Sequence, residues 1–321
     1  MKITKLSKNF TPLHEGILFD IDSENETPAD LVVEIIDVAK GEVVATQLLR
    51  SVVSETVNIA PYITHIGEYA PTQHRQSVIT QAPTASYKIR VEDIESEEVV
   101  VSVNRCEVVS TPTTVTSFPD NRRIAPGEND ELLIIAGKGK RLYVEMVADT
   151  GEMLHLEEFS SSEAMRLIIS TEDFDTKVRS FDVALYCDGK EFGSIHYMVA
   201  PAIKTATRLA WISDSGTIEQ YTFPLSRSAK RSADKQVIAI DQGVVATRCQ
   251  AKQFISLSSR IEPRATIEAI AQIASATKVW VKQGENWRLV EVVTPYLEYN
   301  LLGEPSHLYL DVCLWQKEVA L

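Results

Sequence analysis

Two copies of one β-strand pattern lie in tandem in this chain, and the repeat restricts the fold more than any other feature. The first copy reads LVVEIIDVAKGEVV at residues 31–44, and the second reads LYVEMVADTGEML at residues 142–154. In both copies, apolar residues recur at every second position before a turn that contains glycine, which is typical of a β-hairpin with one buried face. The sequence therefore predicts two β-modules of the same architecture.

A second pair of blocks extends the match further along each copy. The aligned residues are Tyr87, Ile89 and Val91 in the first copy and Phe181, Val183 and Leu185 in the second. The offset between the copies falls from 110 at the two turn glycines to 94 at these blocks. The first copy therefore has about 16 additional residues, which we assign to a long loop at residues 61–84.

Short strands with turn signals at close intervals are typical of β-sandwiches. We predict a mainly β chain with two tandem immunoglobulin- or fibronectin-like sandwiches, at residues 1–110 and 111–203. A linker rich in Pro, Thr and Asn separates the two modules, as expected at a domain boundary. A third domain, at residues 204–321, is expected to be α+β.

One short helix is expected in the third domain. Pro263 precedes ATIEAIAQIAS, where Ile267, Ile270, Ala271 and Ala274 share one helical face. The segments VIAIDQ, VVATRC, QFISLSSR, KVWVKQGENWRLVEVV and LYLDVCLWQKEV predict strands of an antiparallel sheet. We interpret the polar, basic stretch 226–235 as a mobile solvated loop, with contact to an acidic partner as the alternative.

The net charge of −13 is unevenly distributed. Residues 1–205 have 19 Lys or Arg and 33 Asp or Glu, whereas residues 206–321 have 13 and 12. The acidic N-terminal part of the chain repels the phosphates of nucleic acid, so we expect no nucleic-acid partner. No apolar stretch approaches the roughly 20 residues that span a bilayer, and the N-terminus lacks the apolar core of a signal peptide. We expect cytoplasmic synthesis without a signal peptide and no membrane partner.

Motifs that carry chemistry are not found. The chain has no GxSxG, Walker or GxGxxG sequence, and its four cysteines are scattered. The acidic run from Asp20 to Glu26 resembles the start of a calcium loop, but Asn25 and Leu31 stand where that loop needs Gly and Glu. We predict no enzyme, cofactor or metal site. A glycosidase pair of carboxylates leaves no local sequence signature and stays open as an alternative.

Nine residues are candidates for interaction with a partner. The segment 61–84 could be a binding loop, because aromatic and basic side chains supply contact area; the alternative is a loop that packs on its own module. The rings at the start of the third domain are interpreted as core, with a sugar-binding sheet as the alternative. The candidates are His65, Tyr69, His74, Arg75, Trp211, Tyr221, Arg227, Lys230 and Arg231.

The segment Leu209-Ala210-Trp211-Ile212-Ser213, with Gly216 and Tyr221-Thr222-Phe223, resembles an LxWxNxxGxxxxYTF signature. That signature occurs in proteins of prophage-like clusters in Bacteroides and relatives, which look like virion or tail components. The resemblance covers about 115 residues, and Ser213 stands where the pattern more often has Asn.

The resemblance implies a structural protein of a phage-like particle that acts through protein–protein contacts. Its partners would be other proteins, including further copies of itself in a ring or rod, and it brings no catalytic residues. The alternative is a surface adhesin or carbohydrate-binding protein of a gut-type bacterium.

Overall fold

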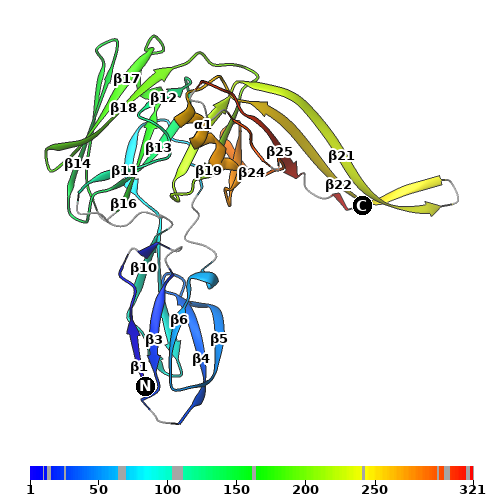
Figure 1. Ribbon diagram of the computed structural model, residues 1–321. Coiled ribbons are helices and arrows are strands. Elements are labelled where there is room, and N and C mark those ends of the chain that lie inside the picture. Colours follow the sequence, from blue (N-terminus) through cyan, green and yellow to red (C-terminus); the bar gives the residue numbers. More distant parts are fainter. Residues whose placement is uncertain are drawn as a thin grey trace.

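The computed structural model describes residues 1–321 except 10, 13–15, 25–26, 64–69, 103–110, 161–163, 241–242, 295, 300–303, 316–318 and 321. The described chain is mainly β, with a single short α-helix (Figure 1). The predicted fold class is therefore confirmed.

The first sandwich packs two sheets against each other. One sheet has the order β1 (Lys2–Lys5), β3 (Leu18–Asp22) and β6 (Ser54–Asn58). The other has the order β2 (Thr11–Pro12), β10 (Val99–Ser102), β8 (Thr84–Val91), β4 (Ala29–Asp37) and β5 (Glu42–Val52), with β9 (Ile94–Glu95) beside β8. Alternate residues of both sheets, including Phe19, Ile35 and Ile89, form a core that excludes water.

The second sandwich has the same plan. One sheet has the order β11 (Thr113–Val115), β13 (Asn129–Ile135), β16 (Ala164–Ser170) and β7 (Val78–Gln81). The other has the order β12 (Asn121–Ile124), β18 (Lys190–Val199), β17 (Ser180–Cys187), β14 (Arg141–Ala148) and β15 (Met153–Phe159). A short 3-10 helix, η3 (Thr171–Asp173), follows β16.

The structure bears out the repeat down to strand register. In both sandwiches the larger sheet has equivalent strands in the same order, and its first two strands are parallel. Val33 lies opposite Val91 in the first sandwich. The aligned residues Val144 and Leu185 lie opposite each other in the second. The two patterns therefore encode the same pairing.

The segment 61–84 differs from the expected loop of the first module. After the short 3-10 helix η2 (Ala60–Tyr62), the chain crosses to the second sandwich, where β7 pairs antiparallel with β16. The reason is burial, because Ile79 enters the second core and is only 8% exposed. The additional residues thus tie one sandwich to the other.

The C-terminal region is one antiparallel sheet with a helix. Its strand order is β20 (Ile218–Phe223), β19 (Thr207–Ile212), β23 (Val279–Gln283), β24 (Asn286–Val292), β25 (Tyr309–Trp315), β22 (Gly243–Ser258) and β21 (Leu225–Ile240), with β26 (Val319–Ala320) on β22. The helix α1 (Arg264–Ala271) begins directly after Pro263, as predicted. It continues as the 3-10 helix η4 (Gln272–Ala274), and the tighter turn buries Ile273 instead of Ala274.

The basic stretch 226–235 is not a loop. It belongs to β21, which pairs with β22 to form a continuous hairpin of two 16-residue strands. We call residues 225–258 the arm. It projects from the C-terminal sheet, away from both sandwiches (Figure 1).

Candidate interaction surface

The arm leaves the sheet with little support from the rest of the chain. β25 pairs with β22 only between Lys252 and Ser258. Further out, β26 adds pairs at Arg248 and Cys249 alone. At about 3.3 Å per residue, the ten β21 residues from Arg231 to Ile240 extend about 30 Å. Two-stranded ribbons of this kind are at best marginally stable in water by themselves.

The side chains of the arm are both basic and apolar. The arm has six Lys or Arg and two Asp, a net charge of +4 in a chain of −13. Leu225 and Val237 are 55% and 56% exposed. Arg227 places its guanidinium 4.6 Å from the centre of the Tyr309 ring, which rigidifies the base of the arm. Lys230 and Arg231 are exposed, and neither has a carboxylate partner within the described part of the chain.

The four candidates in the segment 61–84 divide into two pairs. His65 and Tyr69 lie outside the described residues. The His74 carbonyl accepts a hydrogen bond from the Asn129 amide, and burial together with the charge of Arg166 lowers the His74 pKa. Arg75 is exposed and lies 3.7 Å from the Glu285 carboxylate. His74 and Arg75 therefore lie between the second sandwich and the C-terminal domain, whereas Ile63 packs in the first core.

Trp211 and Tyr221 lie in the C-terminal core. Trp211 is fully buried, and the Tyr221 ring stacks on Phe118 with centroids 6.5 Å apart. The Tyr221 hydroxyl donates to the buried Glu262 carboxylate at 3.1 Å. Both rings therefore pack in the C-terminal core, in agreement with their interpretation, and Tyr221 also lines two cavities beside it.

The signature residues around these rings encode a hairpin. β19 and β20 pair across a turn in which Gly216 adopts a φ of 77°, a conformation that favours glycine. The Ser213 hydroxyl lies 2.7 Å from the Thr217 hydroxyl and braces the same turn. A short polar side chain at position 213 can therefore brace the turn as the Asn of the signature would.

A buried polar network joins the second sandwich to the C-terminal domain. The Arg208 guanidinium donates to Glu128 at 2.8 Å and to the Asn129 carbonyl. Glu219 lies on β20, and its side chain contacts the segment that follows β11 of the second sandwich. Its carboxylate accepts from the Ser117 amide at 2.7 Å and the Thr116 hydroxyl at 2.9 Å. Such buried groups need each other's hydrogen bonds, so the two domains are held in one orientation.

Glu219 has a strongly perturbed pKa in this network. It is fully buried, and desolvation raises its pKa to about 7, although the Arg122 charge and the hydrogen bonds to Thr116 and Ser117 oppose the shift. Its second carboxylate oxygen has no hydrogen-bond partner within the described part of the chain. A proton on this oxygen relieves the cost of a buried charge.

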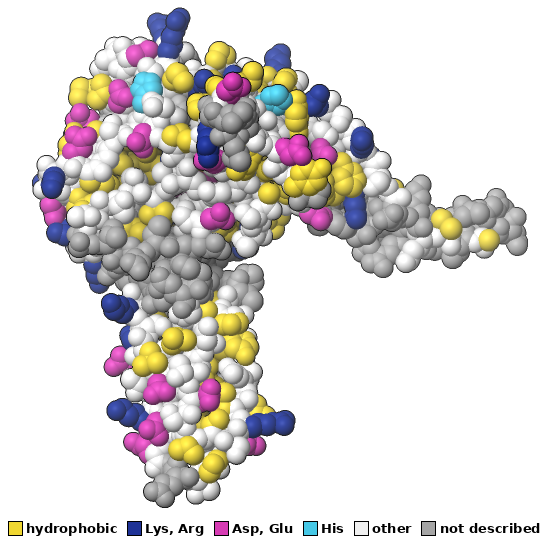
Figure 2. Space-filling view, in the orientation of Figure 1, with side chains coloured by type: hydrophobic (Ala, Val, Ile, Leu, Met, Phe, Trp, Pro, Cys, Tyr) yellow, Lys and Arg dark blue, Asp and Glu magenta, His cyan; other side chains and the backbone are white. Residues whose placement is uncertain are grey.

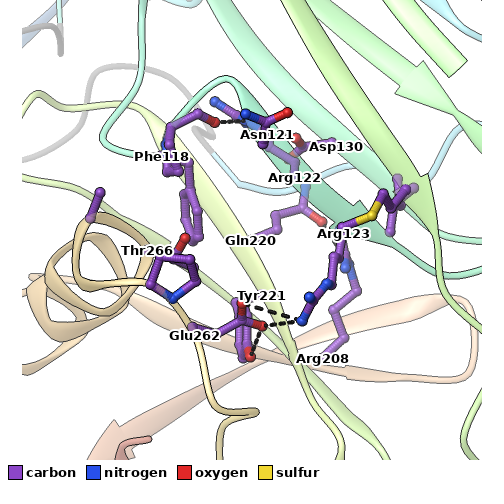
Figure 3. A pocket seen from close by; sticks show the side chains of 15 residues that line it. Phe118, Asn121, Arg122, Arg123, Asp130, Arg208, Gln220, Tyr221, Glu262 and Thr266 are labelled. Atoms are coloured by element: carbon purple, nitrogen blue, oxygen red, sulfur yellow. Dashed lines mark hydrogen bonds and ion pairs between the residues drawn. The ribbon is translucent and has the colours of Figure 1, made fainter. Parts of the chain in front are cut away.

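A cavity of about 250 Å³ lies in the same joint. Figure 3 shows Arg123 pointing at Glu262 across it, and their closest atoms are 3.3 Å apart. A second cavity, of about 270 Å³, shares Arg123 and Glu262. The first cavity has no Ser, Cys or His in its lining, and its two carboxylates, Asp130 and Glu262, are both paired with arginine. The hydroxyl-bearing residues Tyr221 and Thr266 also line it.

Within the ranges that the structure describes, no three His, Cys, Asp or Glu residues come together in a way that could hold a metal ion. None of the helices in those ranges is long and apolar enough to cross a membrane.

Comparisons with known proteins add no family to this picture. No protein-family model matches the sequence, and no curated protein matches it. Among solved structures, the chain is similar to a marsupial T cell receptor at 9% identity, over 100% of this chain and 99% of that one. The TM-score is 0.19, which is too low to bear on fold or function.

Proposed function

We propose that this protein is a non-enzymatic structural or assembly protein, a tail-type component of a phage- or prophage-like particle that acts through protein–protein contacts. The arm is the single observation that carries the proposal. A ribbon of two 16-residue strands has no core of its own, and its outer strand exposes unpaired backbone groups. An element of this kind is stabilised when another chain covers it.

The body of the molecule supports the same role. β7 fastens the first sandwich to the second, and the buried network around Arg208 and Glu219 fastens the second sandwich to the C-terminal domain. The arm therefore extends from a braced body, so a partner that binds the arm is positioned relative to the whole chain. Preorganisation of this kind lowers the entropy cost of assembly.

The aromatic residues give carbohydrate binding little support. Trp211, Phe223 and Trp280 are buried. Tyr309, on β25, is 48% exposed, but the Arg227 guanidinium lies over its ring. Stacking on a sugar needs a free aromatic face, so we propose assembly.

The test is incorporation into particles. Particles released by the producing bacterium are purified on a density gradient, and this chain is quantified in each fraction. In a matched strain, the chain lacks residues 232–252 and joins Arg231 to Gln253, which lie opposite each other, through an Asn-Gly turn. We expect the intact chain in the particle fractions and at least about tenfold less of the shortened chain, equivalent to 1.4 kcal/mol of contact energy.

The control replaces Lys138 and Lys177, which are exposed on the second sandwich, with glutamate. This variant should be incorporated normally. Absence of the intact chain from every particle fraction, or equal incorporation of the shortened chain, contradicts the proposal.

A further inference from the structure

The partner that binds the arm can be inferred from the charges of the candidate surfaces and from the sheet edges that are left open. Two arms pairing with each other would bring together two ribbons of net charge +4. Like charges placed directly across a sheet edge are destabilising. The first sandwich is the opposite case, because residues 1–102 have 8 Lys or Arg and 16 Asp or Glu. An arm is therefore attracted to the sandwich of another copy and repelled by another arm.

In the first sandwich, β5 is a terminal strand whose outer edge is open, so it can pair with the open edge of β21. This strand ends its sheet and, at 11 residues, is the longest terminal strand in the described sheets after β21. Natural sheets protect their edges with charged residues. β5 has none between Glu42 and Arg50, a stretch that reads VVATQLL.

Apolar side chains cluster at this edge. Val44 and Leu48 on β5 are 42% and 50% exposed, and Val32, opposite Leu48 on β4, is 47% exposed. Figure 2 shows hydrophobic side chains on the surface of the first sandwich, the lower lobe in that view. The terminal strand of the equivalent sheet in the second sandwich is different, because β15 includes Glu157 and Glu158. Of these two terminal strands, β5 is thus the one without charged side chains along the middle of its edge.

We infer that the occupant is a second copy of this chain: the arm of one copy adds its β21 edge to the β5 edge of the next copy's first sandwich. The inference rests on the proposed function and deepens it by naming the partner. Backbone hydrogen bonds between the two edges supply the pairing, and the apolar residues of both strands become covered. Lys230 and Arg231 come to lie over an acidic module.

This contact is heterologous, since the arm of one copy meets a different surface of the next. A chain of such contacts still has one free arm at one end and one free β5 edge at the other. Copies therefore add head to tail and close into a ring, or they continue as an open filament. Long-range attraction between basic arm and acidic sandwich also makes the association sensitive to salt.

The test measures self-association of the full purified chain by analytical ultracentrifugation, at low and at high salt. The arm variant is Lys230→Glu with Arg231→Glu, and the edge variant is Val44→Lys with Leu48→Lys. Each has a control with the same change of charge on the second sandwich. The controls are Lys138→Glu with Lys177→Glu, and Met153→Lys with Phe159→Lys. All of these side chains are exposed, and circular dichroism checks that each variant is folded.

We expect the intact chain and both controls to associate at low salt and to dissociate as salt rises. The arm and edge variants should each bind themselves at least about tenfold more weakly. A mixture of the two variants should form a one-to-one heterodimer, because each retains the half that the other has lost.

An intact chain that stays monomeric at low salt overturns the inference, as does an arm or edge variant that associates normally or a mixture that forms no heterodimer. A monomeric chain that still enters particles would leave the proposed function standing with a different partner. Absence from particles would remove the proposed function itself.

Discussion

Replacing Glu219 with glutamine should remove a pH dependence from the stability of the C-terminal domain. The side chain is fully buried, and desolvation raises its pKa from 4.5 to about 7. In the unfolded chain the pKa returns to its ordinary value. Between about pH 4.5 and 7, the folded protein therefore binds more protons than the unfolded protein. Its free energy of unfolding falls as the pH rises through this window.

The magnitude follows from the size of the shift. Each pKa unit is worth about 1.4 kcal/mol, so a rise from 4.5 to about 7 corresponds to about 3 kcal/mol. This stability is fully present below pH 4.5 and is lost by about pH 7. Glutamine mimics the protonated carboxyl and does not titrate. The stability of the wild type relative to Glu219→Gln should therefore fall by about 3 kcal/mol across the window.

Tryptophan fluorescence is the appropriate signal for this experiment. All four tryptophans lie in the C-terminal domain, and Trp211 lies directly opposite Glu219 in the sheet. Urea unfolding of both proteins is measured at intervals from pH 4 to pH 8. The difference between them isolates Glu219, because Glu131, whose pKa burial also raises, titrates in both. The groups that face Glu219, namely Arg122, Asp130 and Tyr197, are likewise present in both.

A constant difference between the two proteins from pH 4 to pH 8 would refute the reasoning. It would mean that Glu219 keeps an ordinary pKa and that the hydrogen bonds from Thr116 and Ser117, with the charge of Arg122, outweigh its desolvation. A difference that grows in favour of the wild type as the pH rises would refute it more strongly.

Four further substitutions, of which Arg141→Ala is a control, test separate parts of the structure by urea unfolding monitored by circular dichroism. Ile79→Ala, in the strand that the first module lends to the second core, should destabilise the second sandwich by about 2 to 4 kcal/mol; no effect would mean that β7 does not dock. Arg166→Ala leaves the buried Glu131 without its partner and should cost about 3 to 5 kcal/mol, whereas Arg141→Ala breaks an exposed pair and should leave the stability nearly unchanged. Gly189→Ala, at a φ of 79°, should cost about 1 kcal/mol, and an unchanged stability would contradict a left-handed turn there.

Much of the two sandwiches could be predicted from the sequence because their strands have one buried and one exposed face. Buried apolar residues recur at every second position in both copies, at Leu31, Val33 and Ile35 and at Leu142, Val144 and Met146, and this period of two specifies both the strand and the side that enters the core. The same holds for α1, where Ile267 and Ile270 are buried as the helical spacing requires. The function and the partner of the chain remain proposals.

The destination of the segment 61–84 could not be predicted in this way. VITQ at residues 78–81 is short, and nothing in it distinguishes pairing within the first module from pairing with β16 of the second. The alignment of the two copies located the additional residues correctly. Their destination depended on a long-range pairing, which local patterns do not report.

The arm escaped prediction for a related reason. Alternation reveals a strand only when one of its faces is buried within the same chain, and Lys230 and Arg231 stand next to each other on a ribbon exposed on both faces. A different signal was present. Between Pro224 and Pro263, the sequence has no proline, and Gly243 is its only glycine. A stretch of that length with one turn residue at its centre is typical of two long strands and a tight turn. Within the part of the chain that the structure describes, no other element packs on the outer half of β21, and this is an argument that the surface that covers it belongs to another molecule.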